Sequence, residues 1–175
     1  MTHAYQPIAR PAAGGDVFTR NTLADDVRRP MIELLNQHLA DAVDLGTHAR
    51  QAHWNVSGPN FIALHELFDK VYQRLQGHAD AIAERVTALG GIAAGTATVA
   101  VEHSRLPRYP IDAVGGAVHI EALSIALASF GRSVREAIDR AADAGDMVTS
   151  DLFTEICRDV DQQLWLVEAH LRTQT

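Results

Sequence analysis

The stretch HWNVSGPNFIALHELFDKVYQRLQGHADAIAE, residues 53–84, sets the arrangement of the whole chain. It contains a histidine, a short turn through Gly58 and Pro59, and one uninterrupted amphipathic run. Apolar residues recur in that run at spacings of three and four, as in a helix with one buried face: Leu67, Phe68, Val71, Leu75, Ala79, Ile82, Val86 and Leu89. We therefore expect a helix over residues 60–89. Because the turn is short, this helix should return antiparallel beside a preceding one.

Four polar residues of this helix share a second face. On an ideal helix the side chains of His65, Asp69, Asp80 and Glu84 fall within an arc of about 100°, centred roughly 130° from the apolar stripe. They would flank the core, where another subunit could pack. Imidazole and carboxylate groups on one face suggest a transition metal, although such residues also commonly form a plain solvated face. The pattern alone leaves both interpretations open.

The axial spacing shows how a metal could be held. At about 1.5 Å per residue, His65 lies roughly 28 Å from Glu84, so one helix carries two half-sites. The residue numbers are symmetric about the point between Arg74 and Leu75. Two copies packed antiparallel about a two-fold axis there would bring His65 and Asp69 of one beside Asp80 and Glu84 of the other, which predicts an isologous dimer with two equivalent sites.

The preceding helix should begin near residues 26–30, since proline is tolerated only in a first turn, and should end near residue 56. His53 would then lie at its end, where it can approach His65 of the same chain. After Gly90 and Gly91, residues 92–113 form a long crossover. A connection of that length usually holds structure of its own, and residues 96–103 are the best candidate for a short helix.

Two further amphipathic helices are expected over residues 113–144 and 149–172, separated by Gly145. The chain is therefore predicted to be all-α, with four long helices in one bundle. An up-down bundle with short loops would not need the long connection between the second and third helices, whereas a bundle with one crossover does.

Composition limits the function classes. Residues 1–22 contain proline and glycine without periodicity and read as a flexible tail, leaving residues 23–175 for the bundle. Fifteen basic and 22 acidic residues give a net charge of −7, which argues against a surface built to coat nucleic acid. Arg10 and Arg20 leave a DNA-binding arm open as an alternative to a disordered terminus.

Cys157 is the only cysteine, so no intrachain disulfide can form, and its apolar neighbours favour inert packing over a nucleophilic role. We see neither a signal peptide nor a run of about 20 apolar residues that would cross a membrane. These features predict a cytoplasmic protein.

Several separated motifs together resemble the Dps family, the DNA-binding proteins from starved cells or mini-ferritins of bacteria and archaea. They occur in order at the family's spacing: Gln51-Ala52-His53-Trp54-Asn55-Val56, Gly58-Pro59-Asn60-Phe61, Leu64-His65-Glu66 and Asp80-Ala81-Ile82-Ala83-Glu84-Arg85. The Leu89-Gly90-Gly91 exit, the Tyr109-Pro110 segment and residues 161–165 extend the resemblance.

The resemblance implies a ferritin-like four-helix bundle whose long crossover carries a short helix, assembled from two-fold dimers into a hollow homododecamer. It implies a ferroxidase site that takes His53, His65 and Asp69 from one subunit and Asp80 and Glu84 from the other. Such a site would oxidise Fe²⁺ with hydrogen peroxide or dioxygen. The assembled protein would then store Fe³⁺ mineral within the shell and so protect DNA from oxidative damage. No Glu-x-x-His motif is present, which argues against a di-iron centre inside one bundle.

Four more residues match family features. Trp54 resembles a tryptophan near the site that shelters radicals, although a packed interface aromatic is an equal alternative. Asp146, Asp151 and Glu155 resemble an acidic three-fold pore that would draw Fe²⁺ inward. Acidic residues near a helix start also stabilise the helix dipole, which is the plainer explanation.

Two rival functions remain at this stage. One is a DNA-compacting protein associated with the nucleoid, in which iron chemistry is secondary. The tail here lacks the lysines of the best-known DNA-binding members, which weakens that interpretation. The other is a helical scaffold that binds no metal.

Overall fold

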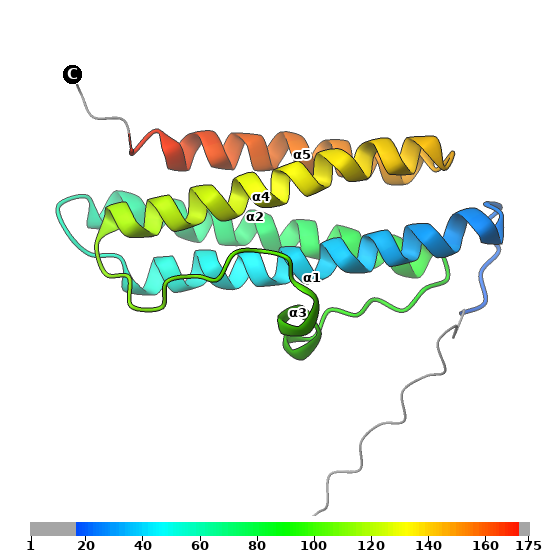
Figure 1. Ribbon diagram of the computed structural model, residues 1–175, viewed down its shortest axis with the longest axis horizontal. Coiled ribbons are helices and arrows are strands. Elements are labelled where there is room, and N and C mark those ends of the chain that lie inside the picture. The colour runs from blue at the N-terminus through cyan, green and yellow to red at the C-terminus, as the bar shows by residue number, and fades with distance from the viewer. Residues whose placement is uncertain (1–16, 172–175) are drawn as a thin grey trace, which may run out of the picture.

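The computed structural model describes residues 17–171, in which α-helices lie side by side as a bundle (Figure 1). The helices are α1 (Asp25–Asn55), α2 (Phe61–Ala88), α3 (Ala97–His103), α4 (Gly116–Asp143) and α5 (Met147–Glu168). The described residues form no β-strand. This arrangement confirms the predicted all-α four-helix bundle with a short helix in the second connection.

The bundle consists of two antiparallel pairs, α1 with α2 and α4 with α5 (Figure 1). The crossover from α2 to α4 runs along α1, and α3 stands off to one side of it. Side chains of α1 fix this path. The Asn36 amide donates to the Ile92 carbonyl and accepts from the Ala94 N–H, and the Gln37 amide donates to the His103 carbonyl. The crossover is therefore tied to α1 by polar contacts.

The core lies between the two pairs. Of the stripe predicted on α2, only Leu67 is partly exposed, and the rest is buried against α1, α4 and α5. Cys157 is buried in the same core, and burial raises the pKa of its thiol. Both observations fit a packing role for this cysteine.

Two helices end on glycine. Gly90 and Gly145 each have a φ of +83°, in the left-handed region. At the end of α2 the Gly90 N–H donates to the Thr87 carbonyl and the Gly91 N–H to the Val86 carbonyl. The same paired hydrogen bonds follow α4, from Gly145 and Asp146 to two carbonyls of its last turns. Both ends are Schellman caps, which satisfy carbonyls that the helix itself leaves unpaired.

The start of α1 was predicted on the premise that Pro30 lies in the first turn, and that premise was wrong. Helix α1 begins at Asp25, so Pro30 lies beyond the first turn. Proline has no N–H to donate to the carbonyl four residues earlier, and its exposed position leaves that carbonyl to solvent. The helix continues because its apolar face packs on the core on both sides of Pro30, with Val27 partly buried before it and Met31 and Leu34 buried after it.

The ends of the chain are only partly described. Of the predicted tail, residues 1–16 lie outside the described residues, as do residues 172–175 at the other end. From residue 17 the chain contacts the bundle, where the Val17 N–H donates to the Gly90 carbonyl at 2.8 Å. Among the helices that the structure describes, none has the length and apolar character needed to cross a bilayer.

Candidate metal centre

The two histidines that flank the α1–α2 turn lie face to face. His53 in the last turn of α1 and His65 in α2 have ring centroids 3.7 Å apart, with an interplanar angle of 25°. The Nδ1 of His53 lies 2.9 Å from the His65 carbonyl, and the Nδ1 of His65 lies 2.8 Å from the His53 carbonyl. The turn brings the two rings together because it reverses the chain within five residues.

These two contacts define the tautomers. A carbonyl oxygen can only accept a hydrogen bond, so the proton of each neutral ring must sit on Nδ1. Each Nε2 then carries a free lone pair. Metal-ligating histidines usually donate their other ring N–H to a carbonyl or carboxylate, which fixes the orientation of the ring. The pair therefore has the hydrogen bonding expected of two imidazole ligands.

Asp69, one turn after His65, is engaged by two neighbours. Its carboxylate accepts from the Arg50 guanidinium at 2.8 Å and from the Gln73 amide at 2.7 Å. The Arg50 guanidinium also lies over the Tyr72 ring, 4.0 Å from its centroid, and 5.9 Å from the centroid of Trp54. The pair of Arg50 and Asp69 is about two-thirds buried, so a cation binding to Asp69 would compete with the guanidinium.

Asp80 and Glu84 lie toward the other end of α2 and are exposed. Within the described residues no ion pair or hydrogen bond joins their carboxylates to another group. The same part of the chain contains no group of three or more His, Cys, Asp or Glu side chains able to hold a metal. One chain thus brings His53 and His65 together, holds Asp69 to Arg50 and Gln73 one turn after His65, and leaves Asp80 and Glu84 toward the other end of α2.

Exposed apolar side chains lie close to the histidines in the sequence, on both sides of the α1–α2 turn. Trp54 is 69% exposed and Ile62 is 62% exposed, and the Phe61 ring lies 5.2 Å from that of His65. Apolar groups gathered around polar ligands are typical of a surface that another protein covers.

The predicted pore residues separate into two kinds. Asp151 and Glu155 are exposed on α5. Asp146 is 1% exposed and caps α5 by accepting from the Thr149 N–H at 3.0 Å. It also binds the Arg85 guanidinium at 2.7 and 3.0 Å. Its carboxylate is therefore occupied within the bundle.

The pKa of the Asp146 carboxyl reflects these contacts. Burial raises it, but the hydrogen bonds from Thr149 and the charge of Arg85 outweigh burial and hold it below its usual value. Asp146 is therefore ionised at neutral pH and serves the fold locally.

Sequence reasoning overlooked Arg50. It lies three residues before His53, on the same face of α1, and the antiparallel return of α2 brings it to Asp69. That spacing could have identified it, because the short turn predicted which positions of the two helices meet.

Known proteins resemble this chain in both sequence and fold. A ferritin-like domain model matches residues 32–174. The DNA protection during starvation protein of Agrobacterium fabrum is 40% identical over 90% of this chain and 97% of that protein. Among solved structures, DpsC from Streptomyces coelicolor covers 92% of this chain and 95% of its own at 31% identity, with a TM-score of 0.87. Mycobacterium smegmatis Dps covers 90% and 89% at 30% identity, with a TM-score of 0.85. By sequence and by fold, this chain belongs to the Dps family of ferritin-like proteins.

Proposed function

We propose that this protein is a ferroxidase that oxidises Fe²⁺ at sites shared between two copies of the chain and stores the Fe³⁺ in a hollow homododecamer. The observation that carries the proposal is the reciprocal hydrogen bonding of His53 and His65, which leaves both Nε2 atoms free as ligands. Family membership supports the assembly and the iron chemistry.

Each site would combine two unlike halves. One chain supplies His53, His65 and Asp69, and an antiparallel copy of α2 supplies Asp80 and Glu84. Carboxylate oxygens with a few imidazoles suit iron, and a site between subunits can leave room for the oxidant. Fe²⁺ is the substrate here. Two Fe²⁺ ions would give one electron each to hydrogen peroxide, which takes up two protons and leaves as two water molecules; dioxygen is the alternative oxidant.

Arg50 would keep Asp69 neutralised until Fe²⁺ arrives, because a buried carboxylate without a counter-charge is costly. Its cation–π contacts with Tyr72 and Trp54 would hold the guanidinium in place when it releases Asp69. Trp54, next to His53, would donate an electron when oxidant exceeds iron, which limits the escape of radicals.

Entry of iron would use the exposed carboxylates of Asp151 and Glu155. Repeated around a three-fold axis, they would focus negative potential and draw cations inward. Asp146 supports this opening indirectly, because it caps the helix on which both residues lie.

The test is iron oxidation by a double variant. Anaerobic Fe²⁺ followed by peroxide should give rapid ferric absorbance in the wild type, and an Asp80→Ala, Glu84→Ala variant should lose that rapid phase. Glu66→Ala, which removes an exposed carboxylate from the same helix outside the proposed site, should keep it. An unchanged rate in the double variant would remove the site assignment.

The second candidate is DNA binding, favoured by the name of the Agrobacterium fabrum relative. It would give the protein a cytoplasmic, nucleoid-associated location and make iron chemistry secondary. The net charge of −7 opposes a broad DNA-binding surface, so the N-terminal arm with Arg10 and Arg20 would have to carry the contact. A gel shift that weakens with salt and with removal of residues 1–20 would support it. Absence of a shift at low salt would exclude it.

A further inference from the structure

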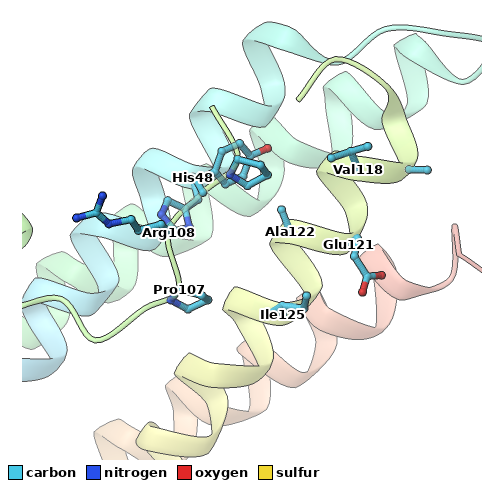
Figure 2. Close-up of a pocket in the computed structure, with 10 residues that line it drawn as sticks. His48, Pro107, Arg108, Val118, Glu121, Ala122 and Ile125 are labelled. Carbon is cyan, nitrogen blue, oxygen red and sulfur yellow. The ribbon is translucent and has the colours of Figure 1, made fainter. Parts of the chain in front are cut away.

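A tyrosine and a histidine that are not candidate iron ligands share a short hydrogen bond. The hydroxyl of Tyr109, at the end of the crossover, lies 2.5 Å from the Nδ1 of His119 in the first turn of α4. His119 is 0% exposed, and its ring centroid lies 6.1 Å from that of Tyr109. Figure 2 shows Pro107, two residues earlier on the crossover, facing Ala122 of α4. The end of the crossover thus brings a phenol against a buried base.

The proton of this hydrogen bond belongs to the tyrosine. Burial lowers the pKa of His119, and the carbonyl of Asn55 raises it only in part, so the ring is neutral at neutral pH. Tyr109 occupies Nδ1, so Nε2 is the nitrogen that faces this carbonyl, with no hydrogen-bond partner at closer range. A carbonyl only accepts and therefore favours the ring proton on Nε2. Nδ1 is then an acceptor, and the Tyr109 hydroxyl, whose pKa burial raises, donates to it as a phenol.

The Asn55 carbonyl also relates this pair to the proposed iron site. Asn55 is the last residue of α1 and directly follows Trp54, the residue proposed to donate an electron when oxidant exceeds iron. A backbone hydrogen bond of 3.2 Å from Ser57 to the crossover holds the end of α1 against the segment that leads into α4. A route from Trp54 to Tyr109 therefore crosses only the backbone of Asn55 and the ring of His119.

Tyr72 is the other tyrosine that the structure describes, and its surroundings disfavour oxidation. The Arg50 guanidinium lies 4.0 Å from the centroid of its ring, and a positive charge at that distance opposes the loss of an electron. Within the described residues no base accepts a hydrogen bond from the Tyr72 hydroxyl. Of the two tyrosines, only Tyr109 has a base placed to take its proton.

We propose that Tyr109 returns an electron to Trp54 after Trp54 has been oxidised, and so carries the oxidising equivalent from the surface into the protein. This step rests on the proposed function, in which excess oxidant takes an electron from Trp54. The Trp54 radical cation accepts one electron from Tyr109, and the hydroxyl proton moves to the Nδ1 of His119. The products are an intact indole, a neutral tyrosyl radical and an imidazolium. The positive charge moves from the indole to the imidazole, so electrons, atoms and charge balance.

The base makes this step possible. An oxidised phenol is a very strong acid, so a phenol gives up an electron readily only where its proton can leave at the same time. His119 stands within hydrogen-bond reach of that proton, which is the geometry required of a general base. Trp54 is 69% exposed whereas His119 is fully buried, so the transfer moves oxidising power away from molecules in solution.

Pulse radiolysis in azide solution tests the step without iron or peroxide. The azidyl radical oxidises indole side chains, and an indole radical that has lost its N–H proton to water regains one from water on reduction. In the assembled full-length protein, the absorbance of the tryptophan radical should decay as that of a tyrosyl radical rises. The rate should not depend on protein concentration, because both residues lie in one chain.

Four variants identify the residues at the two ends of the transfer. Trp54→Phe should abolish the transfer, whereas Trp165→Phe, which removes the exposed tryptophan of α5, should keep it. Tyr109→Phe should abolish the tyrosyl signal, whereas Tyr72→Phe should keep it. The helical circular dichroism of the wild type is the check on folding.

The role of His119 is tested separately. His119→Gln keeps a hydrogen-bond acceptor but removes the base, so it should slow the transfer by about 100-fold. In the wild type the transfer should also be slower in D₂O than in water, because the proton moves with the electron. The isotope measurement keeps the test open if His119→Gln does not fold.

Three results would overturn the proposal. Absence of the transfer in the wild type would remove the step altogether. A tyrosyl signal that is unchanged in Tyr109→Phe would place the electron donor elsewhere. Equal rates in D₂O and water would exclude His119 as the proton acceptor. Because no iron is present, these results are independent of whether the protein is a ferroxidase, which the Asp80→Ala, Glu84→Ala variant tests.

Discussion

Individual side chains hold the candidate iron ligands in one orientation. His53 and His65 each donate from Nδ1 to the other's carbonyl, so both Nε2 atoms keep their direction without help from a third residue. The sequence predicted His53 as a candidate ligand through the family resemblance alone, and His65 through helix periodicity as well. The contact between Arg85 and Asp146 was beyond that reasoning, because it joins residues 61 positions apart whose meeting depends on how the two helix pairs stack.

The buried ion pair of Arg85 and Asp146 leads to a stability prediction. Asp146→Ala removes the cap of α5 and leaves a guanidinium that is 14% exposed without its partner. We expect a loss of about 3 kcal/mol in the free energy of unfolding, measured by denaturant titration. Asp151→Ala, an exposed aspartate in the same helix, should change it by less than about 0.5 kcal/mol. Similar values for the two variants would contradict the role assigned to Asp146.

The lowered pKa of Asp146 gives that contribution a pH dependence. A carboxyl whose folded pKa lies below its unfolded value of 3.8 stabilises the fold above that value. Its contribution is lost as the pH falls through the folded pKa. The difference in unfolding free energy between the wild type and Asp146→Asn should therefore be largest at neutral pH and shrink below about pH 4. A difference that stays constant from pH 7 to pH 3 would show that this carboxyl does not titrate with folding.

At the scale of the helix, the sequence predicted all five elements: the four long helices from their apolar period of three and four, and the short one from the length of the connection that holds it. The differences lie at the ends. Helix α4 begins at Gly116, three residues later than expected, because the crossover stays extended and Ser57 pairs with Gly115 as an isolated bridge. Such contacts between a loop and a distant turn leave no periodic signal.

The two glycine caps provide a matched pair of substitutions. Gly145→Ala places a methyl group in open space, so only the positive φ opposes it, at a cost of about 1 kcal/mol. At Gly90 an added Cβ would lie 2.8 Å from the Val17 carbonyl oxygen and 2.8 Å from the Thr19 side chain. Gly90→Ala should therefore cost at least about 2 kcal/mol, from the strained φ together with overpacking. It should also increase amide hydrogen exchange at Val17.

Denaturant titration and hydrogen exchange on the two variants measure both effects. If Gly90→Ala and Gly145→Ala cost the same and Val17 exchanges as in the wild type, the segment from residue 17 does not depend on its contact with α2.

At the scale of the whole molecule, the proposed chemistry needs two chains. The two-fold arrangement stays a prediction from the symmetry of residue numbers along α2. Within one chain, Asp80 and Glu84 lie toward the other end of that helix from His65. The number of subunits could not be predicted from residue spacing, because it depends on contacts formed by surfaces outside α2. The exposed side chains of Trp54 and Ile62 do not fix that number either.

A mixing experiment tests the division of each site between chains. His65→Ala damages the imidazole half and Glu84→Ala the acidic half, so either variant alone should lose rapid iron oxidation. When the two are unfolded and reassembled together, random pairing gives about one quarter of the sites both intact halves. The mixture should therefore recover about one quarter of the wild-type rate.

The control is a mixture of His65→Ala with His53→Ala, which damages the same half in both chains and should recover nothing. No recovery in the first mixture would mean that one chain supplies the whole site. Recovery in the control would mean that the two histidines of a site come from different chains, which would also contradict the proposed division.

The separation of the two halves of the proposed iron site along α2 determines when a newly made chain becomes active. The imidazoles of His53 and His65 lie near the start of α2, and the carboxylates of Asp80 and Glu84 lie toward its end. On the proposed function, a newly made protomer therefore holds no complete site and cannot oxidise iron. Oxidation would begin only once a sibling has docked. Fe³⁺ would then form on a surface that assembly is enclosing. The rate of iron oxidation per protomer would rise with protein concentration, as in a bimolecular reaction.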